Sequence, residues 1–173
     1  MKNKMNSKYS PIQVVFHWIS AIIILWAIVS GFSVAFFDIF FPYKDLISYI
    51  NVSLTTIFIP ILLLRIIFCF LRGKPENTHL KKLEQFIASC AHVLIYINMV
   101  IVMITGVLMM ESPITVFGWF EFSQPVKDSE LTSVFRHIHT ISCMTLTALI
   151  FLHIIAVVKH QIKGHAILRK MSL

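Results

Sequence analysis

Histidines inside apolar stretches are the residues of this sequence whose type and spacing suit redox chemistry. Six of them lie within or at the edge of such stretches, and His137 is predicted to face away from the bundle because it is about 160° around its helix from His153. The other five are His17, His92, His139, His153 and His160. Ionisable side chains at membrane depth are costly and usually serve a function. His139 and His153 are fourteen residues apart, a spacing that returns to almost the same helix face about 21 Å further along. One helix would present two imidazoles to one interior, which favours two stacked haems over one compact metal site.

Four long apolar segments are the elements that must position these histidines. The chain of 173 residues is 57% hydrophobic and only 13% charged. Each segment exceeds the roughly 18 residues that predict a membrane span, and together they cover about 11–37, 46–71, 85–110 and 131–158. The sequence therefore predicts an all-α integral membrane four-helix bundle, with residues 1–173 forming a single membrane domain. The first segment is too long for a signal peptide and is predicted to remain as a span.

Basic residues cluster before the first segment, between the second and third, and after the fourth. They are Lys2, Lys4, Lys8, Arg72, Lys74, Lys81, Lys82, Lys159, Lys163, Arg169 and Lys170. By the positive-inside rule these ends face the cytoplasm, so both the N- and C-termini are predicted to be cytoplasmic. The formal net charge of +7 is thus mostly a topology signal and does not predict nucleic-acid binding.

This topology gives each histidine a depth. His17 and His92 lie about two turns into the first and third helices, near the cytoplasmic leaflet. The fourth helix runs inward, so His139 is near the outer face and His153 is near the inner one. Three histidines from three helices therefore converge on the inner half, and a haem iron with two axial imidazoles takes its ligands from facing helices. His160, seven residues beyond His153, either contacts a haem propionate or a quinone carbonyl or is solvated at the interface.

Two arginines, Arg65 and Arg136, lie at the ends of the apolar segments. Either would suit a haem propionate, because the guanidinium fork matches a carboxylate. The alternative for Arg65 is that it extends to the lipid headgroups. The alternative for Arg136 is that it attracts an anion approaching from outside.

The three cysteines, Cys69, Cys90 and Cys143, lie in different apolar segments and form no CxxC or CxxCH motif. This pattern argues against disulfides, iron–sulfur clusters and covalent c-type haem. The longest segment between spans, about 111–130, shows no helical periodicity. Its aromatic residues are predicted either to form an interfacial belt or to act as a lid over an outer pocket, and they are Phe117, Trp119, Phe120 and Phe122.

In the order and spacing of its residues the chain resembles the bacterial cytochrome b561 family of short four-helix membrane proteins. The residues that carry the resemblance are Tyr9-Ser10, His17-Trp18, Leu46-Ile47, Asn51-Val52-Ser53, Arg65, Ala91-His92, Ile95-Tyr96, Gly106-Val107-Leu108-Met109-Met110, His139, Leu152-His153, His160 and Leu168-Arg169. The resemblance implies two b-type haems, one per leaflet, and electron exchange with ubiquinone. It also implies that the protein lies in the bacterial inner membrane, in contact with lipid. Some members oxidise periplasmic superoxide and pass the electron to quinone.

One position departs from the family's pattern. Where the family has a histidine at the outer start of helix two, followed four residues later by glycine, this chain has Asn51 and Thr55. Asparagine is a poor axial ligand for haem iron. Three outcomes are open: the outer haem is absent, it is five-coordinate on His139 with an open site, or another chain completes it. The chain is therefore expected to hold one or two haems b.

Three functions fit this sequence. The first is electron transfer between haem and ubiquinone, with His17 and His153 as the preferred axial pair and His92 as the main rival. Superoxide is a candidate donor, although six outer-loop carboxylates oppose an anion: Asp38, Asp45, Glu111, Glu121, Asp128 and Glu130. The second is a haem-carrying anchor and electron conduit for a redox partner subunit of a larger respiratory complex. The third is a haem-free scaffold in which the histidines are polar contacts between helices.

Overall fold

The computed structural model describes residues 8–37, 42–72, 81–164 and 167–172. Four long helices dominate it: α1 (Pro11–Phe36), α2 (Lys44–Arg72), α3 (Lys82–Leu108) and α4 (Ser129–Ile162). All four are long and apolar enough to cross a membrane. The prediction of a four-helix, membrane-spanning fold is confirmed, with helix bounds within four residues of the predicted ones.

A small hairpin between α3 and α4 was not predicted. Strands β1 (Ile114–Val116) and β2 (Phe120–Phe122) pair antiparallel, with Ile114 opposite Phe122. Three residues are too few to show the alternation of apolar and polar side chains by which a strand is recognised in a sequence. A last short helix, α5 (Ile167–Lys170), follows α4.

Local sequence explains where two of the helices begin. Ser10 precedes α1, and its hydroxyl accepts a hydrogen bond from the backbone N–H of Gln13, whose side chain in turn accepts from the backbone N–H of Ser10. Pro11 follows at the first helical position, where its missing N–H costs nothing. At the start of α4 the Asp128 carboxylate accepts from the backbone N–H groups of Glu130 and Leu131. These caps fix the first turn of each helix and hence the register of its histidines.

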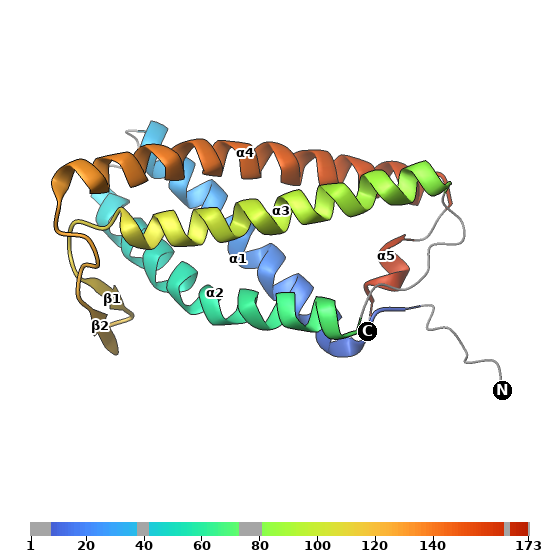
Figure 1. The fold of residues 1–173 in the computed structure, drawn as a ribbon, viewed down its shortest axis with the longest axis horizontal. Helices are drawn as coiled ribbons and strands as arrows, with labels where there is room; N and C mark the ends of the chain where they lie inside the picture. The colour runs from blue at the N-terminus through green and yellow to red at the C-terminus, as the bar shows by residue number, and fades with distance from the viewer. Residues whose placement is uncertain (1–7, 38–41, 73–80, 165–166, 173) are drawn as a thin grey trace.

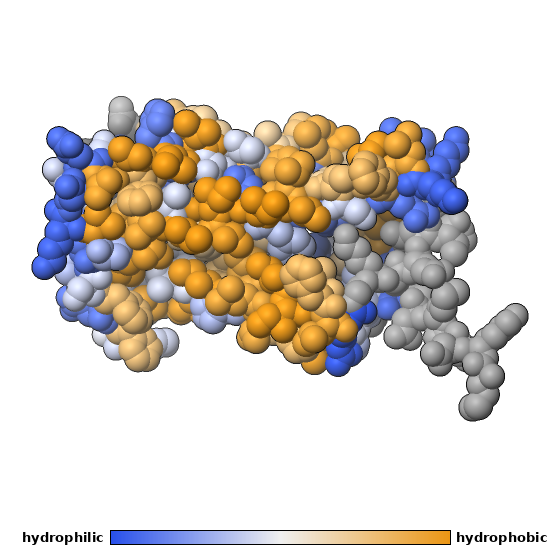
Figure 2. Space-filling model, viewed as in Figure 1, coloured by the Kyte–Doolittle hydropathy of each residue, from blue (hydrophilic) through white to orange (hydrophobic). Residues whose placement is uncertain are grey.

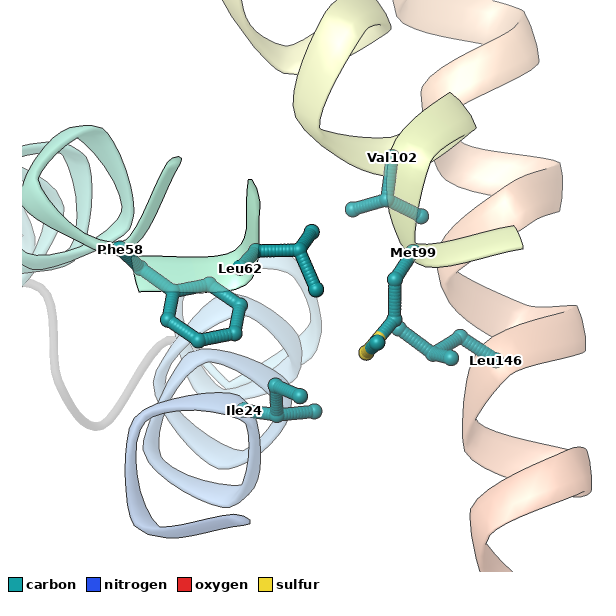
Figure 3. Packing of buried hydrophobic residues seen from close by; sticks show 6 residues of the cluster. All are labelled: Ile24, Phe58, Leu62, Met99, Val102 and Leu146. Atoms are coloured by element: carbon teal, nitrogen blue, oxygen red, sulfur yellow. The ribbon is translucent and has the colours of Figure 1, made fainter. Parts of the chain in front are cut away.

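The helices form two pairs, α1 with α2 and α3 with α4, and the pairs meet more sparsely than the helices within each pair (Figure 1). A buried apolar cluster joins the two pairs at mid-length (Figure 3). It comprises Ile24, Phe58, Leu62, Met99, Val102 and Leu146, so every long helix contributes to it. The cluster separates the interior into two halves.

The two ends of the bundle differ. At one end α1 and α3 begin, α2 and α4 end, and α5 lies nearby; the opposite end carries β1 and β2 (Figure 1). We call these the α5 end and the hairpin end. Between them an apolar surface covers the sides of the helices, with hydrophilic residues gathered at the ends (Figure 2). Such a banded surface fits a protein whose sides are solvated by lipid.

Candidate functional site

Residues at seven-residue intervals on α2 and α4 show which side chains lie at the same level along the long axis of the bundle. They are Asn51, Phe58 and Arg65 on α2 and His139, Leu146 and His153 on α4. Seven residues return an α-helix to nearly the same face about 10 Å further along. Phe58 and Leu146 share the buried cluster, and α2 and α4 run in the same direction, away from the hairpin end (Figure 1). Arg65 and His153 therefore lie at one level towards the α5 end, and Asn51 and His139 at one level towards the hairpin end.

At the α5-end level the structure brings together side chains from all four helices. The guanidinium Nη2 of Arg65 lies 2.9 Å from Nδ1 of His17. The Arg65 guanidinium carbon also lies 5.3 Å from the centre of the Tyr96 ring, within cation–π range. The rings of His92 and His153 meet edge to face with their centroids 5.2 Å apart. All three imidazoles are half-buried.

Hydrogen bonds indicate which nitrogen of two of these rings carries the proton. Nδ1 of His92 lies 2.7 Å from the carbonyl oxygen of Ala88. Because a carbonyl only accepts, this Nδ1 is protonated and Nε2 keeps the lone pair that a metal requires. In His17 the proton lies on Nε2 instead, because Arg65 only donates and Nδ1 must therefore accept. Were His17 to hold haem iron through Nε2, its proton would lie on Nδ1 and Arg65 would have to turn away, which would free the guanidinium for a carboxylate.

A cavity of about 50 Å³ lies beside this cluster, with room for one or a few waters. Its polar lining comes from Tyr9, Gln13, His17, Arg65, Cys69, His92 and Tyr96. Burial raises the pKa of the Tyr9 phenol, with smaller contributions from Cys69 and Tyr96, so this hydroxyl stays a neutral donor at physiological pH.

The C-terminal residues close the cavity from the α5 end. The indole Nε1 of Trp18 donates to the carbonyl of Met171 at 3.0 Å, and the Tyr9 N–H donates to the carbonyl of Lys170 at 3.3 Å. Met171 itself lines the cavity. The end of the chain is thereby tied to the start of α1.

At the hairpin-end level His139 is held between α3 and α4. Its Nδ1 lies 3.1 Å from the carbonyl oxygen of Val102 and 3.2 Å from the hydroxyl of Thr105. Its Nε2 lies 3.4 Å from the Cys143 sulfur. Gly106 permits this approach, because a Cβ there would lie only 3.1 Å from Cε1 of the His139 ring. The Val102 carbonyl fixes the proton on Nδ1, as Ala88 does for His92, and a thiol is only a weak donor to Nε2.

Asn51 faces the same level from α2. Its side-chain oxygen Oδ1 is buried, and within the described part of the chain it has no hydrogen-bond partner. The hydroxyl of Thr55 instead donates to the Asn51 backbone carbonyl at 2.8 Å, inside its own helix. A buried, unpaired amide oxygen costs about 1–3 kcal/mol.

Two of the predicted site residues lie apart from these clusters. His160 is half-buried in the last turn of α4, near enough to Glu84 on α3 for their charges to interact. Arg136 is exposed, and its Nη2 pairs with Oε1 of Glu111 at 2.6 Å. That guanidinium is engaged at the surface of the hairpin end, where an ion pair contributes little to stability.

Sequence reasoning missed three contacts. Tyr96 lies under Arg65, Cys143 lies at Nε2 of His139, and the carbonyl of Ala88 orients His92. Two of them had a signal in the sequence, because Cys143 follows His139 by four residues and Ala88 precedes His92 by four, the spacing of neighbours on one helix face.

The donor groups at the α5 end fit a haem with two axial imidazoles. His17 comes from one helix pair and His92 and His153 from the other, so imidazoles flank the sparsely packed interface from both sides. Arg65 adds a positive charge for a propionate. The hairpin-end level fits haem on one side only, through His139, because α2 contains neither histidine nor methionine from Lys44 to Arg72.

Comparison with known proteins identifies the family of this chain. The family model described as prokaryotic cytochrome b561 matches residues 8–172, almost the whole chain. No curated protein matches it. The resemblance inferred from the sequence is thereby confirmed, and this chain belongs to the prokaryotic cytochrome b561 family, which makes it a membrane protein that binds haem b and transfers electrons.

Proposed function

We propose that this cytochrome exchanges electrons between haem b at the α5 end and ubiquinone in the bacterial inner membrane. The observation that carries the proposal is the meeting of His17, His92, His153 and Arg65 at one level of the bundle. Haem b supplies one-electron chemistry there, since its iron cycles between the ferric and ferrous states. The residues around it determine its ligation, its potential and its access to quinone.

His17 and His153 are the proposed axial pair. Two axial ligands approach iron from opposite sides, so they belong on opposite sides of the space that receives the porphyrin. α3 and α4 pack closely, and the rings of His92 and His153 already touch, which leaves no such space between them. We therefore propose His17 as one ligand. We assign the other to His153 and give His92 the role of supporting the His153 ring from its side.

Arg65 and His160 are the proposed partners of charged and polar groups at this end. Arg65 is the cation for a propionate once it leaves His17. His160, about 10 Å beyond His153 on nearly the same face, is the proposed donor to a quinone carbonyl. Its place in the last turn of α4 is where a lipid-soluble quinone would meet the aqueous side.

The α5 end is proposed to face the cytoplasm. Its described basic residues are Lys8, Arg72, Lys81, Lys82, Lys159, Lys163, Arg169 and Lys170. Lys2, Lys4 and Lys74, which also support this orientation in the sequence, lie outside the described residues. The positive-inside rule places such an end on the cytoplasmic side.

The charges at the hairpin end bear on the electron donor. Five carboxylates among the described residues, Asp45, Glu111, Glu121, Asp128 and Glu130, stand against three cations, Lys44, Lys127 and Arg136. Asp38, the sixth outer carboxylate in the sequence, lies outside the described residues. Arg136 is already paired with Glu111. Because this end disfavours an incoming anion, superoxide is the less favoured donor, and the second candidate function, an electron conduit fed by a partner subunit, gains support.

Quinone exchange can be tested on the purified protein in nanodiscs. Protein reduced anaerobically with dithionite is mixed with ubiquinone-1, and the loss of the reduced haem α band is followed by stopped flow. We expect rapid reoxidation in the wild type and slower reoxidation, with an unchanged haem spectrum, in His160→Ala. His137→Ala is the matched control, because His137 is exposed on the same helix. Reoxidation no faster than in quinone-free nanodiscs would refute quinone exchange, and a soluble redox subunit that co-purifies would support the conduit.

A further inference from the structure

We propose that the hairpin-end level holds a second haem b that is bound by His139 alone, and that the iron face opposite His139 is open to a small diatomic ligand beside Asn51. The ligand class is carbon monoxide, nitric oxide or dioxygen, each of which donates a lone pair to ferrous iron. This inference rests on the haem-binding function proposed above. It adds a ligand-binding site to a protein whose other haem is proposed to have both axial positions filled.

His139 is prepared to bind a metal. Its Nδ1–H is held by the Val102 carbonyl at 3.1 Å, which leaves the lone pair on Nε2. Backbone carbonyls that hold the far nitrogen in this way fix the ring orientation and raise the basicity of the ligand. The contact at Nε2 is the thiol of Cys143, 3.4 Å away, a weak donor that iron would displace.

Asn51 lies at the level of His139, on the other helix pair. It precedes Phe58 by seven residues, and His139 precedes Leu146 by seven. Because Phe58 and Leu146 pack in one cluster on helices of the same direction, both residues are displaced by about 10 Å towards the hairpin end. They come from different helix pairs and thus stand on opposite sides of the interface between the pairs.

The chemistry of Asn51 suits an open site. An amide is a poor ligand for haem iron, whereas its NH₂ group donates hydrogen bonds to a bound diatomic molecule. Its Oδ1 is buried and accepts no hydrogen bond in the described part of the chain, so no donor there fixes the orientation of the amide. Thr55 offers no substitute, because its hydroxyl is committed to the Asn51 carbonyl.

Cys143 does not complete the coordination. It follows His139 by four residues on α4 and so lies on the same side of the interface as the imidazole. A ligand opposite His139 has to come from α1 or α2. Among the described residues of these helices the sole histidine is His17, which lies at the α5 end.

Carbon monoxide is the probe that tests the open site, since it binds ferrous haem only where an axial position is free. Haem is quantified per chain on the purified full-length protein, and reduced-plus-CO minus reduced spectra are recorded. We expect two haems per chain, one low-spin and one that shifts with carbon monoxide. In His139→Ala the CO-binding haem should be lost while the low-spin haem, which reports correct folding, remains.

Two substitutions at Asn51 complete the test. Asn51→His should convert the second haem to low spin and abolish the carbon monoxide signal. Asn51→Leu, which removes the hydrogen-bond donor at similar volume, should keep the signal but raise the dissociation rate of dioxygen or nitric oxide several-fold. One haem per chain, or two haems without a carbon monoxide response, would overturn the inference. A protein without any low-spin haem would instead contradict the function proposed for the α5 end.

Discussion

The imidazole rings of His92 and His153 meet edge to face across the interface of α3 and α4, with their centroids 5.2 Å apart. Two rings in contact on one helix pair cannot bind opposite faces of one porphyrin. At most one of them can therefore bind, together with His17, the haem proposed for this end. In our assignment His153 is the ligand and His92 is the support.

The first prediction separates these two roles. His153→Ala should remove the low-spin haem spectrum of the α5 end, because no imidazole then opposes His17. His92→Ala should keep the low-spin spectrum and the haem content but shift the midpoint potential, since the packing and polarity beside the ligand change. Haem quantification and a redox titration measure both effects, with His137→Ala as the surface control. The reverse pattern, loss of the haem in His92→Ala alone, would exchange the two assignments.

Arg65 provides the second prediction. A positive charge beside haem stabilises the reduced state, which carries one positive charge fewer, and therefore raises the midpoint potential. Arg65→Met should lower the potential by tens of millivolts, and Arg65→Lys should restore part of the difference because it keeps the charge but loses the fork. A potentiometric titration of the α band measures this. An unchanged potential in Arg65→Met would place the guanidinium away from haem, over Tyr96 or in the headgroups.

Much of this arrangement was readable in the sequence because the membrane constrains it strongly. Apolar length marks the four helices, Ser10 with Pro11 marks the start of α1, and a fourteen-residue spacing puts His139 and His153 on one face of α4. The grouping of His17, His92 and His153 was predicted from the depth at which each residue is expected to lie in the membrane. These features depend on local composition and on helix geometry.

Other features depend on contacts that no local pattern records. The pairing of α1 with α2 and of α3 with α4 decides which histidines touch, and it arises from side-chain packing along whole helices. Arg136 was expected to serve an anion or a propionate, but Glu111, twenty-five residues away in the sequence, engages it at the surface. The hairpin depends on Ser53, more than sixty residues before the strands that it contacts.

Gly106 provides the third prediction. Gly106 lies in the last turn of α3, and replacing a glycine within a helix with alanine normally stabilises the helix by up to about 0.5–1 kcal/mol. In Gly106→Ala the new Cβ would lie 3.1 Å from the His139 ring, which cannot withdraw easily because Val102 and Cys143 hold its two nitrogens. We expect a lower melting temperature and a weakened carbon monoxide response with the low-spin haem intact. Gly31→Ala is the matched control, since a Cβ there meets nothing within 4 Å and should raise the melting temperature. Equal stabilisation of both variants would show that His139 is free to move.

The last prediction concerns the hairpin and the end of α2 that it covers. The Ser53 side chain is fully buried; its hydroxyl donates to the Thr115 carbonyl at 3.3 Å and accepts from the Phe117 N–H at 3.2 Å. Ser53→Ala leaves both backbone groups without this partner, at a cost of about 1–3 kcal/mol, so amide hydrogen exchange should accelerate across residues 114–122. Ser33→Ala, which removes a hydroxyl that donates to Val29 within α1, should leave that exchange unchanged.

Ser53 lies two residues from Asn51. The Ser53→Ala variant, in which the hairpin is held less tightly, therefore also tests whether the hairpin shields the hairpin-end level from small ligands. If the hairpin shields that level, carbon monoxide should bind the Ser53→Ala protein faster than the wild type, with the number of haems per chain unchanged. If hydrogen exchange is faster but the rate of carbon monoxide binding is unaltered, the hairpin does not control access to the site. The side chains of Trp119 and Phe120, which are 77% and 63% exposed, would then serve contact with the lipid interface.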